Sequence, residues 1–245
     1  MTPTETTEDA LLDGRIRIRQ PAQGYRVNVD TLLLAAAVEA PNGARLLEAG
    51  CGVGVGLIAV AARSENTTLV GVERDQNIAE IARENVAMNA MMQRIEIVSG
   101  DVLERNANVT TFDGVFCNPP FDQAGEGRAP APHRARAHIA DEPLDRWLAV
   151  LADRLRGGAA LTLIYRARKL SEVLAGLEGR LGGVEILPIR PRAESEASRV
   201  IVRARKGSRA PLRLLPGLDL HDGSGSKHTP EVEAIVRGQA LISWD

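Results

Sequence analysis

Short apolar runs alternate with longer amphipathic stretches along the first half of this chain. The runs 45–49, 68–73 and 95–98 have the length and composition of buried strands. The stretches 54–63 and 76–89 between them carry apolar residues at helical spacing. Strands and helices that alternate in this way form βαβ units, which build a parallel sheet covered by helices on both faces. The pattern therefore predicts an α/β fold with a mostly parallel sheet.

The same patterns predict four further strands, which bring the sheet to seven. These strands are expected at 112–117, 160–165, 184–189 and 200–204, with the last two antiparallel to each other.

Further helices are expected on both sides of this core. One covers 143–155 and is expected to stop at Gly157-Gly158, because glycines commonly end helices. Another covers 169–181. A small hairpin at 15–27 and a helix at 29–39 are expected to precede the first strand of the sheet.

These elements are expected to form one domain, residues 14–245, in which a core at 43–206 lies between an N-terminal extension (14–42) and a C-terminal segment (207–245). Residues 1–13 contain four acids and no base, which predicts a short disordered tail and does not fit a signal peptide. No apolar run reaches the roughly 20 residues that cross a bilayer. The two cysteines show no disulfide framework, so a reduced cytoplasmic setting is expected.

A glycine-rich turn connects the first strand of the sheet to its first helix. Gly50, Gly52 and Gly54, with Cys51 among them, leave the backbone open to close approach by a ligand. The dinucleotide fingerprint G-x-G-x-x-G does not fit, because its last position falls on a valine or a leucine. Glu48 would repel a pyrophosphate, whereas it suits the cationic methionine part of S-adenosylmethionine. A methyltransferase is therefore favoured over a dehydrogenase.

Acidic residues also follow the second and third strands. Glu73, next to Arg74, can accept both hydroxyls of a ribose, and Asp101, next to Val102, is placed to accept from an adenine amino group. In open α/β sheets ligands lie outside the carboxyl ends of the strands. These four residues are therefore expected to complete the cofactor site.

The fourth strand ends abruptly at Asn118-Pro119-Pro120-Phe121. A strand cannot continue through two prolines, so Asn118 is held at the carboxyl edge of the sheet. The Asn118 side-chain carbonyl and the Pro119 backbone carbonyl can both accept from an NH2 group, and Phe121 offers a ring for stacking. We therefore expect Asn118, Pro119 and Phe121 to be catalytic and Asn118 to border the cofactor as well. A surface turn is the alternative.

Basic residues are clustered although the net charge is −2. Such clusters suit the backbone of a nucleic acid, although each could simply be a solvated face. Arg15, Arg17 and Arg19 would share one face of a strand. The expected RNA-binding residues are Arg128, Arg134, Arg136, His138, Arg190 and Arg192.

Roles are also expected for Asp30, the two cysteines and the histidines. Asp30 either N-caps the helix at 29–39 or closes over the cofactor. Cys51 and Cys117, the two cysteines, are expected to be small buried residues, because no metal-binding or disulfide spacing is present. The histidines are too scattered for a metal site, so no metal is expected.

In their order along the chain, these motifs resemble the class I S-adenosylmethionine-dependent methyltransferases, whose fold is Rossmann-like. Asn-Pro-Pro-Phe is similar to the motif of the branch that methylates amino groups. Within it, the chain resembles the bacterial tRNA1(Val) adenine-N6 methyltransferases in three stretches. These are Gln23-Gly24-Tyr25-Arg26 with residues 28–35, Ala135-Arg136-Ala137-His138, and Lys227-His228-Thr229-Pro230-Glu231.

The resemblance implies methylation of adenine N6 in tRNA with S-adenosylmethionine as the cofactor. Guanine N2 in ribosomal RNA stays open as a target, because Phe121 replaces the tyrosine of many members and phenylalanine is frequent in that group. A glutamine side chain in a protein is the next alternative, followed by a non-catalytic module that binds S-adenosylmethionine or RNA. Monomer and homodimer are both left open.

Overall fold

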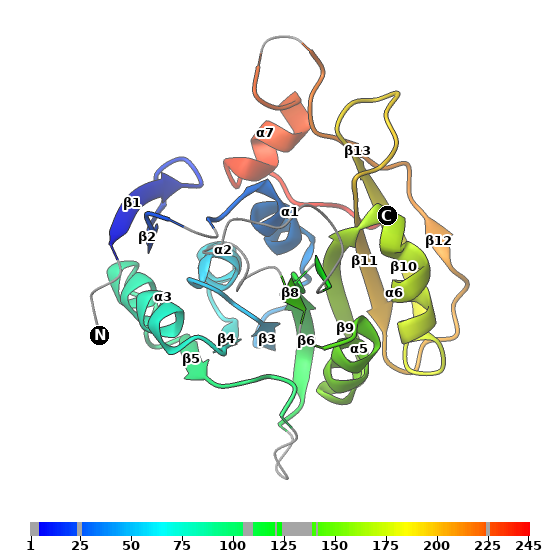
Figure 1. The fold of residues 1–245 in the computed structure, drawn as a ribbon, viewed down its shortest axis with the longest axis horizontal. Coiled ribbons are helices and arrows are strands. Elements are labelled where there is room, and N and C mark those ends of the chain that lie inside the picture. The colour runs from blue at the N-terminus through cyan, green and yellow to red at the C-terminus, as the bar shows by residue number, and fades with distance from the viewer. Residues whose placement is uncertain are drawn as a thin grey trace.

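The structure, a computed structural model, is built on a nine-stranded sheet with helices on both faces (Figure 1). It describes residues 5–23, 26–104, 110–120, 122–123, 139–140, 142–223 and 226–245. The strand order is β12-β10-β11-β9-β6-β3-β4-β5, and β13 also pairs with β10. The strands of this sheet are β3 (Arg45–Ala49), β4 (Thr68–Glu73), β5 (Ile95–Ser99), β6 (Phe112–Cys117), β9 (Leu155–Arg166), β10 (Gly182–Arg190), β11 (Arg199–Arg205), β12 (Arg213–Leu214) and β13 (Leu218–Asp219).

Seven of these strands correspond to the seven expected from the sequence. β3 pairs in parallel with β4 and β6, β4 with β5, and β6 with β9. β11 runs antiparallel to both β9 and β10, which confirms the antiparallel relation expected for the last two. The additions are β12 and β13, each of two residues and each parallel to β10.

The helices cover the two faces of the sheet and bury separate sets of apolar side chains. Leu46 and Leu47, adjacent in β3, belong to opposite clusters, because successive side chains of a strand point to opposite faces. One face packs against α1, α2, α3 and α7, and the other against α5 and α6 (Figure 1). The helices are α1 (Val29–Ala37), α2 (Val55–Arg63), α3 (Gln76–Met88), α5 (Leu144–Asp153), the 3-10 turn η1 (Ala167–Lys169), α6 (Leu170–Leu177) and α7 (Pro230–Val236).

The N-terminal segment differs from the expected disordered tail. β1 (Thr6–Leu11) pairs antiparallel with β2 (Ile16–Pro21), so the hairpin begins well before the expected residue 15. Acids of the first strand have basic partners: Glu8 pairs with Arg17 and lies 3.9 Å from Arg19, both in β2, and Asp9 accepts from Arg26, just after the hairpin, at 2.9 Å. The expectation of disorder is therefore wrong for residues 5–13, because the acidic run has basic partners across the hairpin.

Gly157 and Gly158 also behave differently from the expectation that they end a helix. The helix α5 ends at Asp153, and both glycines lie inside the strand β9. Phe112 at the start of β6 donates its N–H to the Arg154 carbonyl at 2.8 Å, so the pairing with β6 begins directly after the helix. A register shift follows, and Gly158 takes a φ of +80°, which a glycine adopts without strain.

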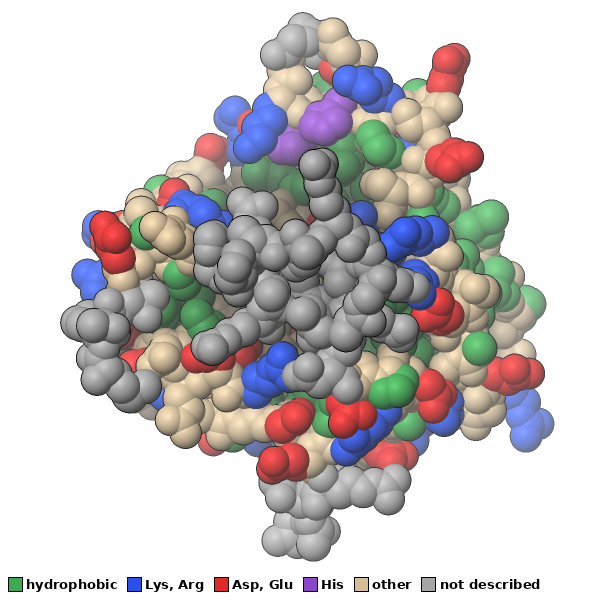
Figure 2. All heavy atoms as spheres, viewed as in Figure 1, with side chains coloured by type: hydrophobic (Ala, Val, Ile, Leu, Met, Phe, Trp, Pro, Cys, Tyr) green, Lys and Arg blue, Asp and Glu red, His purple; other side chains and the backbone are tan. Residues whose placement is uncertain are grey.

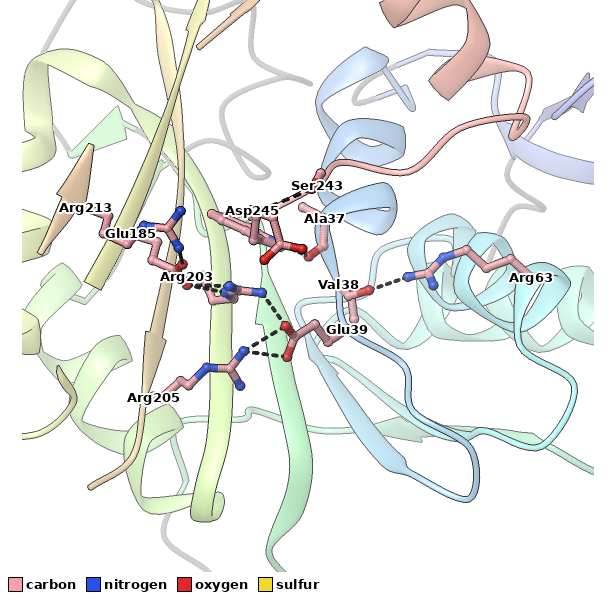
Figure 3. Close-up of polar contacts among 11 residues, drawn as sticks. Ala37, Val38, Glu39, Arg63, Glu185, Arg203, Arg205, Arg213, Ser243 and Asp245 are labelled. Carbon is pink, nitrogen blue, oxygen red and sulfur yellow. Dashed lines mark hydrogen bonds and ion pairs between the residues drawn. The ribbon is translucent and has the colours of Figure 1, made fainter. Parts of the chain in front are cut away.

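A buried ion cluster ties the antiparallel edge of the sheet to the end of α1 (Figure 3). Arg203 of β11 and Glu185 of β10 are only 5% and 7% exposed, and Arg203 Nε donates to Glu185 Oε2 at 2.6 Å. Arg213 donates to the other Glu185 oxygen at 2.9 Å. Arg203 also pairs with Glu39, which accepts two hydrogen bonds from Arg205 at 2.7 and 2.8 Å. The cluster therefore joins three strands to the segment that follows α1.

The C-terminal segment closes over this cluster. The Trp244 ring lies 4.3 Å from the Arg203 guanidinium carbon, within cation–π range, and Trp244 Nε1 donates to the Ala37 carbonyl at 2.9 Å. Before it, Thr229 caps α7, whose Val232 and Ile235 are buried in the cluster that includes α1. No helix in the described parts of the chain is long and apolar enough to span a bilayer.

Two-residue strands β7 (Asp122–Gln123) and β8 (Ile139–Ala140) form a separate parallel pair after the prolines.

Candidate active site

The predicted site residues gather at one edge of the sheet, because the parallel strands β3, β4, β5 and β6 all end there. The glycine turn follows β3, Glu73 ends β4, Asp101 follows β5 and Asn118 follows β6. The sheet order places β3 between β4 and β6, so the glycine turn lies between the ends of those two strands.

The glycine turn is held by β4. Gly50 and Cys51 both donate their N–H groups to the Val72 carbonyl, at 2.9 and 3.1 Å, and Gly52 donates to the Glu73 carboxylate at 3.0 Å. Gly52 has a φ of +54°, and a Cβ there would meet no atom of the described residues within 4 Å. Within the described part of the chain, the backbone at Gly52 is therefore open to close approach by a ligand.

Glu48 lies buried behind this turn, under the start of α2. Its carboxylate accepts from the Leu57 N–H, and its Oε2 has no hydrogen-bond partner in the part of the chain that the structure describes. Burial raises the pKa of Glu48 well above its ordinary value, and the nearby Glu73 raises it further. Gly56 makes room for this carboxylate, since a Cβ there would lie 2.2 Å from Glu48 Oε1. The sequence reasoning missed Gly56, which lies beyond the three glycines of the turn.

Replacing Glu48 with glutamine is expected to stabilise the cofactor-free protein increasingly as the pH rises. A raised pKa means that the folded state holds a proton that the unfolded chain releases near pH 4.3. Wild-type stability therefore falls as the pH rises from there through the folded-state pKa, by up to about 1.4 kcal/mol per pH unit. Urea unfolding of both proteins between pH 5 and 8 measures the difference; a difference that does not change with pH would contradict the expectation.

The carboxylates after β4 and β5 are oriented by backbone N–H groups. Glu73 accepts from Gly52 with one oxygen and from Asp75 with the other, at 2.9 Å. Asp101 accepts from the Leu103 N–H at 2.8 Å. Arg74 is exposed next to Glu73, whereas Val102 is buried behind Asp101.

Asn118 sits directly after β6, as the two prolines predict. The strand ends at Cys117, Asn118 is half-buried and Pro119 is buried. Asn118 Oδ1 is buried without a hydrogen-bond partner among the described residues. Buried polar atoms of native proteins are almost always satisfied, so this oxygen is a candidate acceptor for a ligand. Phe121 lies outside the described residues.

A protein-family model matches the part of the chain that contains this site. The methyltransferase small domain model matches residues 24–175, which include the glycine turn, both carboxylates and Asn118. The chain belongs to the methyltransferase small domain family. It is therefore an enzyme of the S-adenosylmethionine-dependent methyltransferases, and the class I fold expected from the sequence is confirmed.

Individual relatives agree with this family. A protein of Aeromonas salmonicida named tRNA1(Val) (adenine(37)-N6)-methyltransferase is 32% identical over 186 residues, covering 74% of this chain and 77% of the relative. A Vibrio vulnificus protein of the same name is 34% identical over 118 residues, so the match spans about half the length of each chain, 48%. A crystal structure of a predicted O-methyltransferase from Agrobacterium tumefaciens is 31% identical, with a TM-score of 0.73 over 87% of this chain and 98% of the other.

The site of this methyltransferase fits its cofactor. No described residue would meet a Cβ at Gly52, and Glu73 and Asp101 present carboxylates at the ends of the neighbouring strands. Glu48 Oε2, which has no hydrogen-bond partner among the described residues, suits the cationic part of the cofactor better than any phosphate. Trp147, which sequence reasoning did not single out, lies 3.6 Å from where a Gly50 Cβ would be and packs on the turn from α5.

Asp30 of the methyltransferase does not cap α1; its carboxylate is paired with an arginine. The N-cap is Asn28, whose side chain accepts from the Asp30 N–H at 2.9 Å, so the capping alternative for Asp30 is wrong. The Asp30 carboxylate is buried and accepts from Arg199 Nε at 3.2 Å. Because Arg199 begins β11 beside the end of β9, this pair ties α1 to the same edge of the sheet as the cofactor turn.

Several of the basic residues considered for RNA binding already have partners within the protein. Arg15 donates to the carbonyls of Arg237 and Gly238, and Arg17 and Arg19 pair with acids, so these three are occupied within the protein. Figure 2 shows basic and acidic side chains interspersed on one face of the molecule. Of the others, Arg190 donates to Asp219 at 2.5 Å and Arg192 is exposed. Arg128, Arg134, Arg136 and His138 lie outside the described residues.

Both cysteines are buried, as expected. Burial raises the pKa of each thiol, and for Cys51 the nearby Glu48 and Glu73 add to the effect. Neither thiol is therefore a thiolate nucleophile at neutral pH.

Proposed function

We propose that this chain transfers the methyl group of S-adenosylmethionine to an exocyclic amino nitrogen of a nucleobase in RNA, with adenine N6 in tRNA as the preferred target. The observation that carries the proposal is Oδ1 of Asn118 at the end of β6, which is buried and has no hydrogen-bond partner in the described parts of the chain. The names of the relatives support adenine in tRNA as the target.

Asn118 and Pro119 supply two acceptors for one amino group. An exocyclic amine is a weak nucleophile because its lone pair is delocalised into the ring. When the Asn118 side chain and the Pro119 carbonyl accept its two N–H bonds, the nitrogen becomes more pyramidal and its lone pair is directed toward the methyl donor. Positioning and electrostatics then provide the rate gain without a strong base. Phe121 would stack on the base.

The cofactor supplies an electrophilic methyl group when it is bound. Glu73 would hold the ribose hydroxyls, Asp101 the adenine amino group and Glu48 the methionine part, with the glycine turn against the backbone. The proposed cofactor-binding residues are Asp30, Glu48, Gly50, Cys51, Gly52, Gly54, Glu73, Arg74, Asp101, Val102 and Asn118.

Arg192 tests the proposed RNA contact. Because Arg192 is exposed in the loop that follows β10, Arg192→Ala is expected to weaken RNA binding and reduce the slope of log affinity against log salt by about one. Arg17→Ala is the matched control, since Arg17 already pairs with Glu8 and should leave the slope unchanged. Affinity is measured by filter binding of tRNA from about 50 to 200 mM salt. An unchanged slope for Arg192→Ala would remove this residue from the interface.

The proposal as a whole is tested by methyl transfer from labelled S-adenosylmethionine to total bacterial tRNA, with ribosomal RNA alongside. Label in tRNA supports the proposal. Label in ribosomal RNA alone keeps the amino-group chemistry and changes the substrate to a guanine, whereas no label in either RNA points to protein glutamine as the acceptor.

A further inference from the structure

Asn85 of α3 is a polar residue with no exposed surface that connects two distant parts of the chain. Its Nδ2 donates to the carbonyl of Val53, inside the glycine turn, at 2.9 Å. The same nitrogen donates to the Arg19 carbonyl at 2.8 Å, and its Oδ1 accepts from the Arg19 N–H at 2.6 Å. Both amide hydrogens are therefore used, one on the cofactor turn and one on the N-terminal hairpin.

Asn89, one helical turn further on, repeats only half of this arrangement. It accepts from the Arg17 N–H at 3.0 Å and donates to the Arg17 carbonyl at 2.7 Å. Its remaining hydrogen bond, at 2.8 Å, goes to the Asn85 carbonyl of its own helix. Four residues of a helix rise about 6 Å and two residues of a strand about 6.8 Å, so two asparagines at this spacing match alternate residues of β2. Asn89 thus holds the hairpin without touching the cofactor turn.

The glycine turn packs directly against α3. A Cβ at Gly54 would meet Ala82 of α3 at 3.4 Å, so the turn already packs closely on this helix. Val53 is buried between two glycines whose φ values are positive. The peptide between Val53 and Gly54 is held at both ends: its N–H donates to the Cys51 carbonyl at 2.9 Å, and its carbonyl accepts from Asn85 Nδ2 at 2.9 Å.

We propose that Asn85 is a positioning residue for the cofactor, acting through the Val53 carbonyl, and that the N-terminal hairpin braces it. The proposal rests on cofactor binding at the glycine turn and is independent of which RNA or base is methylated.

Asn85→Ala and Asn89→Ala form the matched pair that tests it. Each removes the hydrogen bonds of one asparagine to β2, but only Asn85→Ala also removes the hydrogen bond to the Val53 carbonyl. Binding of S-adenosylhomocysteine by calorimetry is expected to weaken about tenfold or more for Asn85→Ala and to stay within about twofold for Asn89→Ala. The turnover rate at saturating cofactor should change much less than the cofactor affinity. Equal weakening by both variants, or no weakening by Asn85→Ala, would overturn the proposal.

Leu177→Ala separates positioning from general destabilisation. Leu177 is buried against the opposite face of the sheet, so its replacement should lower the melting temperature without altering the affinity for S-adenosylhomocysteine. If it weakens binding as Asn85→Ala does, the effect of Asn85 is one of stability alone.

Hydrogen exchange of the wild-type protein provides a test that needs no variant. Because coupling between sites is reciprocal, S-adenosylhomocysteine should slow exchange of the Arg19 amide, which donates to Asn85, more than that of the Arg17 amide. Unchanged protection of Arg19 in the presence of the ligand would contradict the coupling.

Discussion

Replacing Asn118 with alanine is expected to lower the methylation rate at saturating cofactor by about 100- to 1000-fold, the range seen when one aligned transition-state hydrogen bond is lost. The variant removes the only side-chain oxygen that we propose accepts from the amino group, and no residue that the structure describes bonds to that buried oxygen. Asn118 also borders the cofactor, but the glycine turn and the carboxylates at the ends of β4 and β5 are untouched, so cofactor affinity should stay within about twofold.

Single-turnover kinetics with labelled cofactor, together with calorimetric binding of S-adenosylhomocysteine, separate the two quantities. Pro120→Ala is the matched control, since it lies one residue beyond the two proposed acceptors and should keep activity within about tenfold. If Asn118→Ala retained near wild-type turnover, Asn118 would not be the amine acceptor.

Arg203→Ala is expected to lower the free energy of unfolding by about 3–5 kcal/mol, the range for breaking a buried ion pair from one side. Arg203 is 5% exposed and its loss leaves the buried Glu185 with Arg213 as its remaining ion-pair partner within the described part of the chain. Trp244 would also lose the guanidinium beneath its ring. Urea unfolding at neutral pH measures the change.

Arg205→Ala gives the contrasting case. Arg205 pairs with the same Glu39, but both side chains are substantially exposed, so its removal should change the unfolding free energy by no more than about 1 kcal/mol. Replacing Arg203 and Glu185 together with leucines should recover much of the loss, because no charge is then left buried. Equal effects of the two single alanine variants would show that burial does not determine how much each arginine of this cluster contributes to the free energy of unfolding.

The strands at the centre of the sheet could be predicted because local sequence determines them. The runs at 45–49, 68–73 and 112–117 are apolar, and glycines, acids or prolines end them abruptly; the observed bounds are the same. Strand β9 was predicted too short, because the partners of its first residues are distant in sequence. Leu155 pairs with Phe112 of β6, and Gly158 donates to the Lys206 carbonyl, directly after β11, at 2.9 Å.

Features that depend on distant partners could not be predicted. The acidic residues of β1 resemble a disordered tail when read alone, and their partners, Arg17 of β2 and Arg26 after it, are not adjacent in sequence. The partner of Asp30 is Arg199, 169 residues away, and the partner of Asn85 is 66 residues away. The spacing of Asn85 and Asn89 along one helix face was the available signal.

At the site, the order of motifs along the chain predicted which residues gather at the carboxyl edge of the sheet, because parallel strands bring their ends together. The environment of each residue was beyond that reasoning. Packing between distant segments determines these environments. It buries Glu48 beneath Gly56 and brings Arg15 to carbonyls of the C-terminal segment, to which it donates.

The chemical identity of the methylated nucleoside tests the central claim most directly. After reaction with tRNA, the RNA is digested to nucleosides and analysed by mass spectrometry, with Asn118→Ala in parallel. The account predicts N6-methyladenosine from the wild-type protein and none from the variant. A methyl group on a ribose oxygen or a ring carbon would contradict it, because neither position presents the amino group that Asn118 and Pro119 are proposed to hold.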